Sequence, residues 1–224
     1  MKVLELFAGT RSIGKAFEAA GHEVFSIDWD KSFDGIDWHA DIGTITAEDI
    51  IERFGKPDVI WASPDCTTFS IAAISHHRTK TPDGILLPTS DYAKRCDEID
   101  SHVMDLIEEL QPKYWFVENP VGGMRKSTFM QPYNKKRHTV TYCQYETDKP
   151  ASQRRKKPTD IWTNHPCPNF KPACKNGDPC HAAAPRGAKT GTQGIKGAKA
   201  RSVIPRMLCE HIVHICERGI ECEK

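Results

Sequence analysis

The chain has 224 residues, of which 38% are hydrophobic and 27% are charged, and this length suits one core domain with a small appendage. No stretch approaches the ~20 apolar residues of a membrane-spanning helix, and the first residues read directly as a strand, so we expect a cytoplasmic protein without a secretory signal. Nine cysteines, an odd number in a long chain, favour reduced thiols over a secreted disulfide scaffold.

The net charge of +1 hides a strong asymmetry along the chain. Residues 121–201 carry 17 Lys and Arg against 4 Asp and Glu, a net charge of +13, and the remainder has a net charge of −12. A solvated basic surface is the plain interpretation of such a run. An excess of this size favours contact with a polyanion instead, so we expect nucleic acid as a partner.

Strands and helices alternate through the first half of the chain. Hydrophobic periodicity predicts strands over Val3–Phe7, Glu23–Ile27 and Asp58–Ala62, and helices over Ser12–Ala20 and Ala47–Phe54.

The second half begins with the longest predicted helix, Asp91–Leu110, followed by a buried strand over Lys113–Val117. The segments His138–Gln144 and Asp160–Thr163 are predicted to be later strands of the same sheet, and helical spacing returns over Arg201–Arg218. Strands that alternate with helices at this spacing predict a parallel α/β core.

Two segments break this rhythm. Thr67–Thr89 is predicted to be a long polar loop, either a functional lid or disordered, and Asn164–Ala200 is rich in Pro, Gly, Cys and Lys. We therefore expect a core over residues 1–163, a small basic Cys-rich region over 164–200, and a C-terminal helix over 201–224 that returns to the core.

The first strand–turn–helix unit points to an adenosine-containing ligand. Small residues in the turn Phe7–Gly14 let the backbone approach a ligand, and the helix start favours anionic groups; the spacing does not fit the G-x-G-x-x-G pattern of a dinucleotide site. Asp28 could accept both ribose hydroxyls, Trp29 could cover an adenine face, and Asp41 with Ile42 could meet the adenine edge. A plain surface acid and a packing tryptophan remain the alternatives.

A thiol and a carboxyl group lie at the ends of two predicted strands. Cys66 follows the strand Asp58–Ala62, and Glu118 ends the strand that begins near Lys113. The carboxyl ends of parallel strands are where open α/β folds hold substrates. This pair indicates covalent chemistry on a polar ring.

Together these residues resemble the DNA (cytosine-5)-methyltransferases, in the order in which that family carries its motifs. The resemblance implies a Rossmann-like, S-adenosylmethionine-dependent methyltransferase sheet with a small, irregular Cys/Pro/Gly-rich appendage as a reduced target-recognition region. The matching segments are Leu6–Gly9, Asp28–Trp29, Ser63–Cys66 with Phe69–Ser70, Glu118–Asn119, Gln153–Lys157 and Arg201–Pro205.

The family pattern implies S-adenosyl-L-methionine as the cofactor. Its implied contacts are Phe7, Ala8, Gly9, Thr10, Ser12, Ile13, Asp28, Trp29, Asp41, Ile42, Pro64, Ser202 and Val203.

The resemblance also implies the catalytic roles. Cys66 would add to C6 of cytosine as the nucleophile, and a protonated Glu118 would hydrogen-bond N3. Asn119 would orient the loop or the glutamate, and Arg155 would contact the base carbonyl. No residue is clearly the base that removes the C5 proton, so we expect water there. An inert buried cysteine and a salt-bridged surface acid are the alternatives for Cys66 and Glu118.

The implied substrate is a cytosine rotated out of duplex DNA. We expect a monomer without an obligate protein partner or membrane contact, in a bacterial or phage-infected host cell. The residues expected to contact DNA are Ser70, Arg78, Lys80, Gln153, Lys157 and Lys189.

The chain departs from the family pattern at several positions. Asp65 and Thr67 flank the thiol where the family has Pro and Gln, and Asp65 should discourage thiolate formation unless its charge is paired or turned away. Pro120 follows Glu118–Asn119 in place of Val, and Lys157 replaces an arginine and loses a planar bidentate donor. A catalytically inactive DNA-binding relative, or a cytosine-5 transferase acting on RNA or a nucleotide, therefore remains an alternative.

The appendage contains metal-type ligands in an unusual spacing. A structural zinc would compensate for the absence of an apolar core, but the spacing lacks the C-x2-C element of common zinc modules. Scattered reduced cysteines are the preferred interpretation, and we assign no metal. The residues concerned are His165, Cys167, Cys174, Cys180 and His181.

Overall fold

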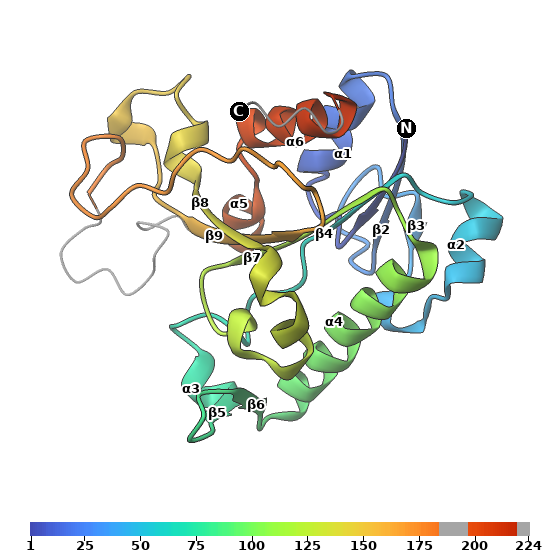
Figure 1. Ribbon diagram of the computed structural model, residues 1–224, viewed down its shortest axis with the longest axis horizontal. Coiled ribbons are helices and arrows are strands. Elements are labelled where there is room, and N and C mark those ends of the chain that lie inside the picture. The colour runs from blue at the N-terminus through green and yellow to red at the C-terminus, as the bar shows by residue number, and fades with distance from the viewer. Residues whose placement is uncertain (184–196, 219–224) are drawn as a thin grey trace.

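The computed structural model describes residues 1–183 and 197–218. Lys189 and part of the predicted basic region lie outside the described residues. The described chain forms a seven-stranded sheet in the order β3-β2-β1-β4-β7-β9-β8, with helices on both faces (Figure 1). The strands are β1 (Lys2–Leu6), β2 (Glu23–Asp28), β3 (Trp38–His39), β4 (Val59–Ala62), β7 (Tyr114–Pro120), β8 (Arg137–Thr141) and β9 (Pro158–Thr163).

The predicted α/β sheet is confirmed, and its strand directions are mixed. Strands β3, β2, β1, β4 and β7 run parallel to one another, whereas β9 runs antiparallel to both β7 and β8. Strand β9 lies between β7 and β8 in the sheet, and no α-helix lies between β8 and β9 in the chain, so β9 can pair with β8 as an antiparallel neighbour. The five parallel strands place their carboxyl ends along one edge of the sheet.

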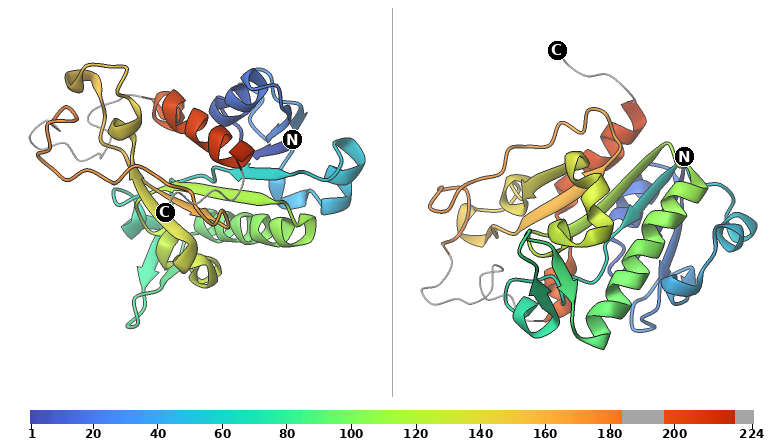
Figure 2. Two further views of the ribbon diagram at one scale, coloured as in Figure 1. Left: turned by 45° about the horizontal axis from the view of Figure 1, so that its top comes forward. Right: turned by 60° about the horizontal axis from the view of Figure 1, so that its bottom comes forward.

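Helices on the two faces bury a separate apolar cluster each. On one face, α1 (Ser12–Ala19) and α6 (Arg206–Arg218) pack together, with Phe17 and Ile212 fully buried. On the other face, α4 (Asp91–Leu110) lies along the sheet (Figure 2). Its apolar positions Val103 and Leu106 pack against the sheet as the spacing predicted. Alternate residues of β1 point to opposite clusters, which is the period of a strand buried on both sides.

The remaining helices are short. They are α2 (Ala47–Arg53), α3 (Ile74–His77) and α5 (Ala198–Ser202), with 3-10 turns η1 (Ile42–Thr44), η2 (Met124–Lys126), η3 (Thr128–Lys136), η4 (Tyr142–Tyr145) and η5 (Ala151–Gln153). Helix α2 begins with a capping box in which Thr46 and Asp49 bond each other's backbone N–H.

The expectation of a long loop over Thr67–Thr89 is wrong. The segment contains α3 and an antiparallel pair, β5 (Arg78–Lys80) and β6 (Leu86–Pro88), which lies beside α3 in Figure 1. Gly84, with φ +93°, supplies the left-handed turn between these strands. Strands β5 and β6 have three residues each, and an alternation of apolar and polar residues over so short a stretch cannot be distinguished from a polar loop in the sequence.

The expected single helix over Arg201–Arg218 is also wrong. Helix α5 ends at Ser202, the chain is extended at Val203, and α6 begins after Pro205. Proline disfavours the helical conformation of the residue before it, which explains the break. Within the described residues, no helix has the length and apolar character needed to cross a membrane.

Candidate active site

The carboxyl ends of β1, β2, β4 and β7 form the candidate site. The strand order reverses between β1 and β4, a point at which open α/β sheets bind ligands. Leu6 pairs with Ala62, and Ala62 pairs with Val117. The loop that carries Cys66 and the end of β7 that carries Glu118 are therefore neighbours.

Hydrogen bonds from the surrounding strands fix the start of the Cys66 loop. The indole of Trp61 donates to the hydroxyl of Ser63 at 2.7 Å, and the Ser63 N–H donates to the Leu6 carbonyl at 3.2 Å. From β7, the amide of Asn119 donates to the carbonyl of Pro64 at 3.0 Å. Asn119 thus joins the two strand ends, as the resemblance implied for a residue that orients the loop.

Asp65 is exposed and its charge is satisfied away from the thiol. One carboxylate oxygen accepts from the N–H and hydroxyl of Thr67 at 2.8 and 2.7 Å, and the other accepts from the hydroxyl of Tyr92. These hydrogen bonds stabilise the carboxylate, but they come from neutral groups, and its charge still raises the pKa of the Cys66 thiol. Tyr92 comes from α4, and no motif in the chain pointed to its contact with Asp65.

The Cys66 thiol is half-buried and lies in a field of mixed charges. Burial raises its pKa above the ordinary value, Glu118 and Asp65 raise this pKa further, and Lys157 lowers it. The thiol and the Glu118 carboxyl therefore interact electrostatically across adjacent strand ends. Among these groups, the cation of Lys157 favours the thiolate.

Glu118 is 6% exposed and is held by a residue that the sequence analysis missed. The hydroxyl of Tyr142 donates to its Oε1 at 3.1 Å, and the ammonium of Lys157 lies 4.7 Å from the centre of the Tyr142 ring. Lys157 also donates to the Arg201 carbonyl at 2.9 Å. Only the pairing of β8 with β9 brings Tyr142 and Lys157 together, so local sequence carried no signal for this contact.

One polar atom of the site is buried without a partner. Among the described residues, Oδ1 of Asn119 accepts no hydrogen bond, and Asn119 has no exposed surface. An unsatisfied buried acceptor costs free energy, and such atoms mark sites where a ligand or ordered water completes the set.

The loop after β1 has an unusual backbone. Phe7, Gly9 and Arg11 have φ values of +53°, +49° and +55°, and left-handed conformations at non-glycine residues cluster at ligand sites. The Gly9 N–H donates to Asp28 Oδ2 at 2.9 Å, and the Asp30 N–H donates to Asp28 Oδ1 at the same distance. Asp28 is thus anchored between the first two loops, with lone pairs remaining for a further donor.

The other predicted cofactor residues of these loops divide into two groups. Trp29 is 71% exposed, so its ring is free to cover a ligand. The side chains of Ile13 and Ile42 are buried in the two apolar clusters, so the expectation that they contact a cofactor is wrong for their side chains. Asp41 forms an ion pair with Arg95 at 2.7 Å at the rim.

The segment before α6 returns to the start of α1, as the resemblance implied. The Ile204 N–H donates to the Ser12 hydroxyl at 3.3 Å, and Val203 is half exposed beside it. A hollow of about 810 Å³ lies here, and neither Cys66 nor Glu118 is among its described lining residues. It brings together five predicted site residues, Ser12, Gln153, Arg155, Lys157 and Val203.

The expectation that Arg78 holds a phosphate is wrong. Its guanidinium is fully buried, forms a bidentate pair with Asp97 at 2.6 and 3.0 Å, and stacks on Phe69 at 3.9 Å. It also donates to the carbonyl and hydroxyl of Thr68. Arg78 therefore braces the loop that follows Cys66.

The remaining predicted contacts are on or near the surface. Lys80 is exposed on β5, and the Ser70 hydroxyl donates to the Thr67 carbonyl at 3.2 Å. Arg155 donates to the carbonyls of Ser152 and Arg154 within its own turn. These three residues do not contact Cys66 or Glu118 through any hydrogen bond of the described structure.

Comparisons with known proteins identify the family. Residues 1–150 match the profile described as C-5 cytosine-specific DNA methylase. The chain belongs to this family. Membership of this family supports a methyltransferase and implies catalysis that depends on S-adenosylmethionine.

A viral relative matches over almost the whole chain. It is the "Probable DNA (cytosine-5)-methyltransferase" of Frog virus 3 (isolate Goorha), 26% identical over 96% of this chain and 100% of the viral protein.

Solved structures are similar to this chain over a smaller share of their own length. An E. coli protein described as a "putative DNA modification methyltransferase encoded within prophage" has a TM-score of 0.50 and 16% identity, covering 73% of this chain and 46% of that one. The Dnmt2 methyltransferase of S. pombe has a TM-score of 0.48 and 14% identity, covering 73% and 48%. The chain thus spans about half the length of these two proteins.

Proposed function

We propose that the protein transfers a methyl group to C5 of cytosine in DNA, through a covalent bond between Cys66 and C6 of a flipped-out base. The observation that carries this proposal is the junction of β4 and β7, where Asn119 fixes the Cys66 loop and the thiol interacts with Glu118. A nucleophile and a carboxyl group on adjacent strand ends suit attack on one ring.

The ends of β1 and β2 fit S-adenosyl-L-methionine as the methyl donor. The exposed ring of Trp29 offers a stacking surface for adenine, and Asp28 is anchored with capacity to accept ribose hydroxyls. The left-handed backbone at Phe7 and Gly9 lets the chain approach a ligand closely. When bound there, the cofactor supplies an electrophilic methyl group.

The residues of the chain would activate the target cytosine by adding to it and would leave it again after methylation. The Cys66 thiolate forms a bond to C6, and the displaced electron density is stabilised by a protonated Glu118 hydrogen-bonded at N3. The hydroxyl of Tyr142 holds that glutamate in place. After C5 is methylated, its proton passes to water, the S–C6 bond breaks, and the thiolate of Cys66 is released.

The positive charge of residues 121–201 and the similarity to a viral protein favour DNA as the substrate. The net +13 over residues 121–201 suits a polyanion rather than a free nucleotide, and the viral relative carries a DNA methyltransferase name. Extruding a base from a duplex costs a few kcal/mol, and contacts between the basic segment and phosphates can offset this cost. The intact Cys66–Glu118 pair argues against an inactive relative.

Trapping the adduct tests the proposal. Purified protein is incubated with labelled S-adenosylmethionine and with duplex DNA, single-stranded DNA, RNA or dCMP, each carrying 5-fluorocytosine. We expect a covalent complex on duplex DNA, because fluorine at C5 blocks release of the nucleophile, and we expect none with Cys66→Ser. Adducts on RNA or dCMP alone, or adducts that persist in Cys66→Ser, would refute the proposed substrate or the proposed nucleophile.

A further inference from the structure

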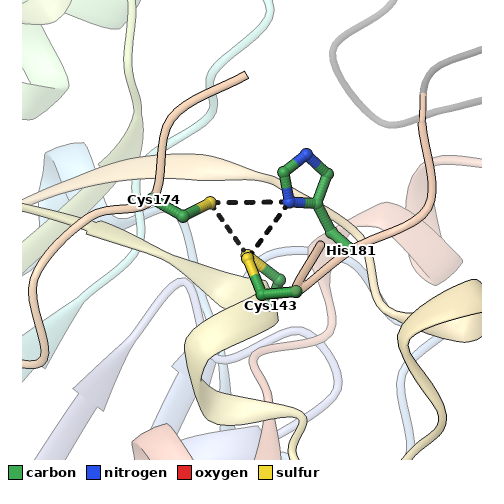
Figure 3. A group of neighbouring side chains, drawn as sticks. Cys143, Cys174 and His181 are labelled. Carbon is green, nitrogen blue, oxygen red and sulfur yellow. Dashed lines mark hydrogen bonds between the residues drawn. The ribbon is translucent and has the colours of Figure 1, made fainter. Parts of the chain in front are cut away.

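Four metal-type side chains that the methyl-transfer chemistry does not use converge beside the sheet. One nitrogen or sulfur atom from each of Cys143, Cys174, Cys180 and His181 lies within 4.8 Å of the other three. Figure 3 shows three of them, with the side chains of Cys143, Cys174 and His181 pointing toward one another. Cys143 lies in η4, directly after β8, and the other three belong to the irregular segment that follows β9.

Four of the six distances among these atoms are close to the edges of a zinc tetrahedron. With Zn–S of about 2.3 Å and Zn–N of about 2.0 Å, tetrahedral geometry places ligand atoms about 3.5 to 3.8 Å apart. The Cys143 sulfur lies 3.2 Å from that of Cys174 and 3.8 Å from that of Cys180. Nδ1 of His181 lies 3.6 Å from the Cys174 sulfur and 3.3 Å from the Cys180 sulfur.

The segment that carries three of these residues needs an external link. Residues 169–183 contain no helix or strand, and none of them is buried. Phe170 packs against one apolar cluster at the start of this segment, but the residues that follow it bury too little apolar surface to offset their conformational entropy. Small irregular units of this kind are stabilised by metals or disulfides, and the thiols of Cys143, Cys174 and Cys180 are free.

Neighbouring groups hold the ligands in this arrangement. The Cys174 N–H donates to the Thr141 hydroxyl at 3.0 Å, and the amide of Gln144 donates to the Cys180 sulfur at 3.4 Å. Hydrogen bonds of this kind orient ligands around a metal. The two partner groups come from the end of β8 and from η4, so the cluster is positioned by the catalytic sheet itself.

We propose that Cys143, Cys174, Cys180 and His181 bind one structural Zn²⁺ that fastens the basic Cys-rich segment to the end of β8. Four protein ligands leave no open position, which is the property of a structural rather than a catalytic zinc site.

Two of the residues first considered as ligands lie elsewhere. His165 is buried and stacked on Tyr114, its Nδ1 accepts from the Cys167 N–H, and its Nε2 bonds the carbonyl of Ile215. Both ring nitrogens are therefore used by the backbone. Cys167 is not part of the cluster. The fourth ligand, Cys143, comes from before β9, so no spacing within the appendage could reveal it.

Metal analysis of the purified full chain tests the proposal. Protein made in zinc-supplemented medium, without a histidine tag and under reducing conditions, is measured by mass spectrometry of its metals. We expect about one zinc per chain, and a cobalt-substituted protein with the visible absorption of tetrahedral thiolate coordination. Zinc far below one per chain together with an octahedral cobalt spectrum would overturn the proposal.

Matched variants identify the ligands. We expect Cys143→Ser and Cys174→Ser to contain about tenfold less zinc, whereas His181→Cys retains it because four thiolates also bind zinc. Cys66→Ser is the control: it loses the covalent DNA adduct and keeps its zinc, so failure of this proposal is distinguishable from failure of the proposed function. Full zinc content in Cys143→Ser would overturn the assignment.

Proteolysis gives a readout that does not depend on the folding of a variant. Treating the wild-type chain with a zinc chelator should speed tryptic cleavage after Lys175 about tenfold, because closure of the segment depends on the metal. Cleavage after Lys94 on α4, identified by peptide mass spectrometry, should not change. Equal cleavage rates with and without chelator would contradict a fastening role.

Discussion

The catalytic sheet and the Cys-rich segment that follows it are stabilised in opposite ways. The sheet buries an apolar cluster on each face, with residues such as Phe17 and Trp162 fully enclosed. Residues 169–183 bury none of their side chains, and their polar and thiol groups converge on one cluster instead. A short chain can therefore attach a further segment without extending its apolar core, provided that a few side chains of that segment form a strong local link.

The two regions should also divide function, and this division gives the largest expected effect. Glu118→Gln in the sheet should lower the rate of methyl transfer about 10²- to 10⁴-fold, because the base loses its proton donor at N3, with little change in DNA affinity. Single-turnover kinetics with labelled cofactor would measure this rate.

A matched change in the appendage should do the reverse. Lys175→Gln should weaken DNA binding and reduce its salt dependence by about one counterion, at an unchanged rate for bound DNA. If Glu118→Gln kept the wild-type rate, or Lys175→Gln lost it, the division between the regions would be refuted.

Truncating one aromatic side chain in each region should lower the free energy of unfolding by different amounts. Phe17→Ala should lower the free energy of unfolding by about 3–5 kcal/mol, because it leaves a cavity between α1 and α6. Phe170→Ala, at a half-buried ring beside His211, should cost about 1 kcal/mol. Denaturant unfolding in the presence of zinc compares the two, and equal losses would show that the appendage shares the apolar core.

A buried acid in β1 should make the stability of the sheet depend on pH. Burial raises the pKa of Glu5 to about 7, opposed by hydrogen bonds from the Gly14 N–H and the Ser26 hydroxyl. The folded state thus holds this proton to a higher pH than the unfolded state, so the associated stability is complete below the unfolded pKa of 4.5 and is lost as the pH rises through about 7.

Removing that charge tests the sign. Glu5→Gln should gain about 1–2 kcal/mol relative to wild type between pH 5 and pH 8.5, measured by urea denaturation at both values. Glu52→Gln, at an exposed position of α2, serves as the control and should show no such change. A gain that is larger at low pH would contradict the assigned burial.

The smallest effect concerns the charge that supports the thiolate. Lys157 lowers the pKa of Cys66, so Lys157→Gln should raise that pKa and slow alkylation of Cys66 by iodoacetamide at pH 8 about threefold. Lys156→Gln, at the adjacent residue whose ammonium bonds Asn176, should leave the rate unchanged. Peptide mass spectrometry resolves Cys66 from the other thiols, and faster alkylation in Lys157→Gln would reverse the assigned role.

Local pattern was enough to predict most of the sheet, because strand and helix periodicities are properties of short segments. Helix Asp91–Leu110 has the predicted ends. The strand ends that carry Cys66 and Glu118 were placed correctly, since topology fixes where parallel strands finish. The β5–β6 pair and the break at Pro205 were missed, because a strand of three residues and a single proline leave weak signals.

By itself, the sequence determined the α/β class, the order of the family motifs and the residues that could perform the chemistry. Only the tertiary structure decided which charges meet. It buried Arg78 against Asp97, joined Tyr142 to Glu118, and brought Cys143 to a cluster whose other members follow β9 in the chain. The physical reason is that a hydrogen bond, an ion pair or a metal site depends on distances in space, and pairing between strands sets these distances independently of separation along the chain.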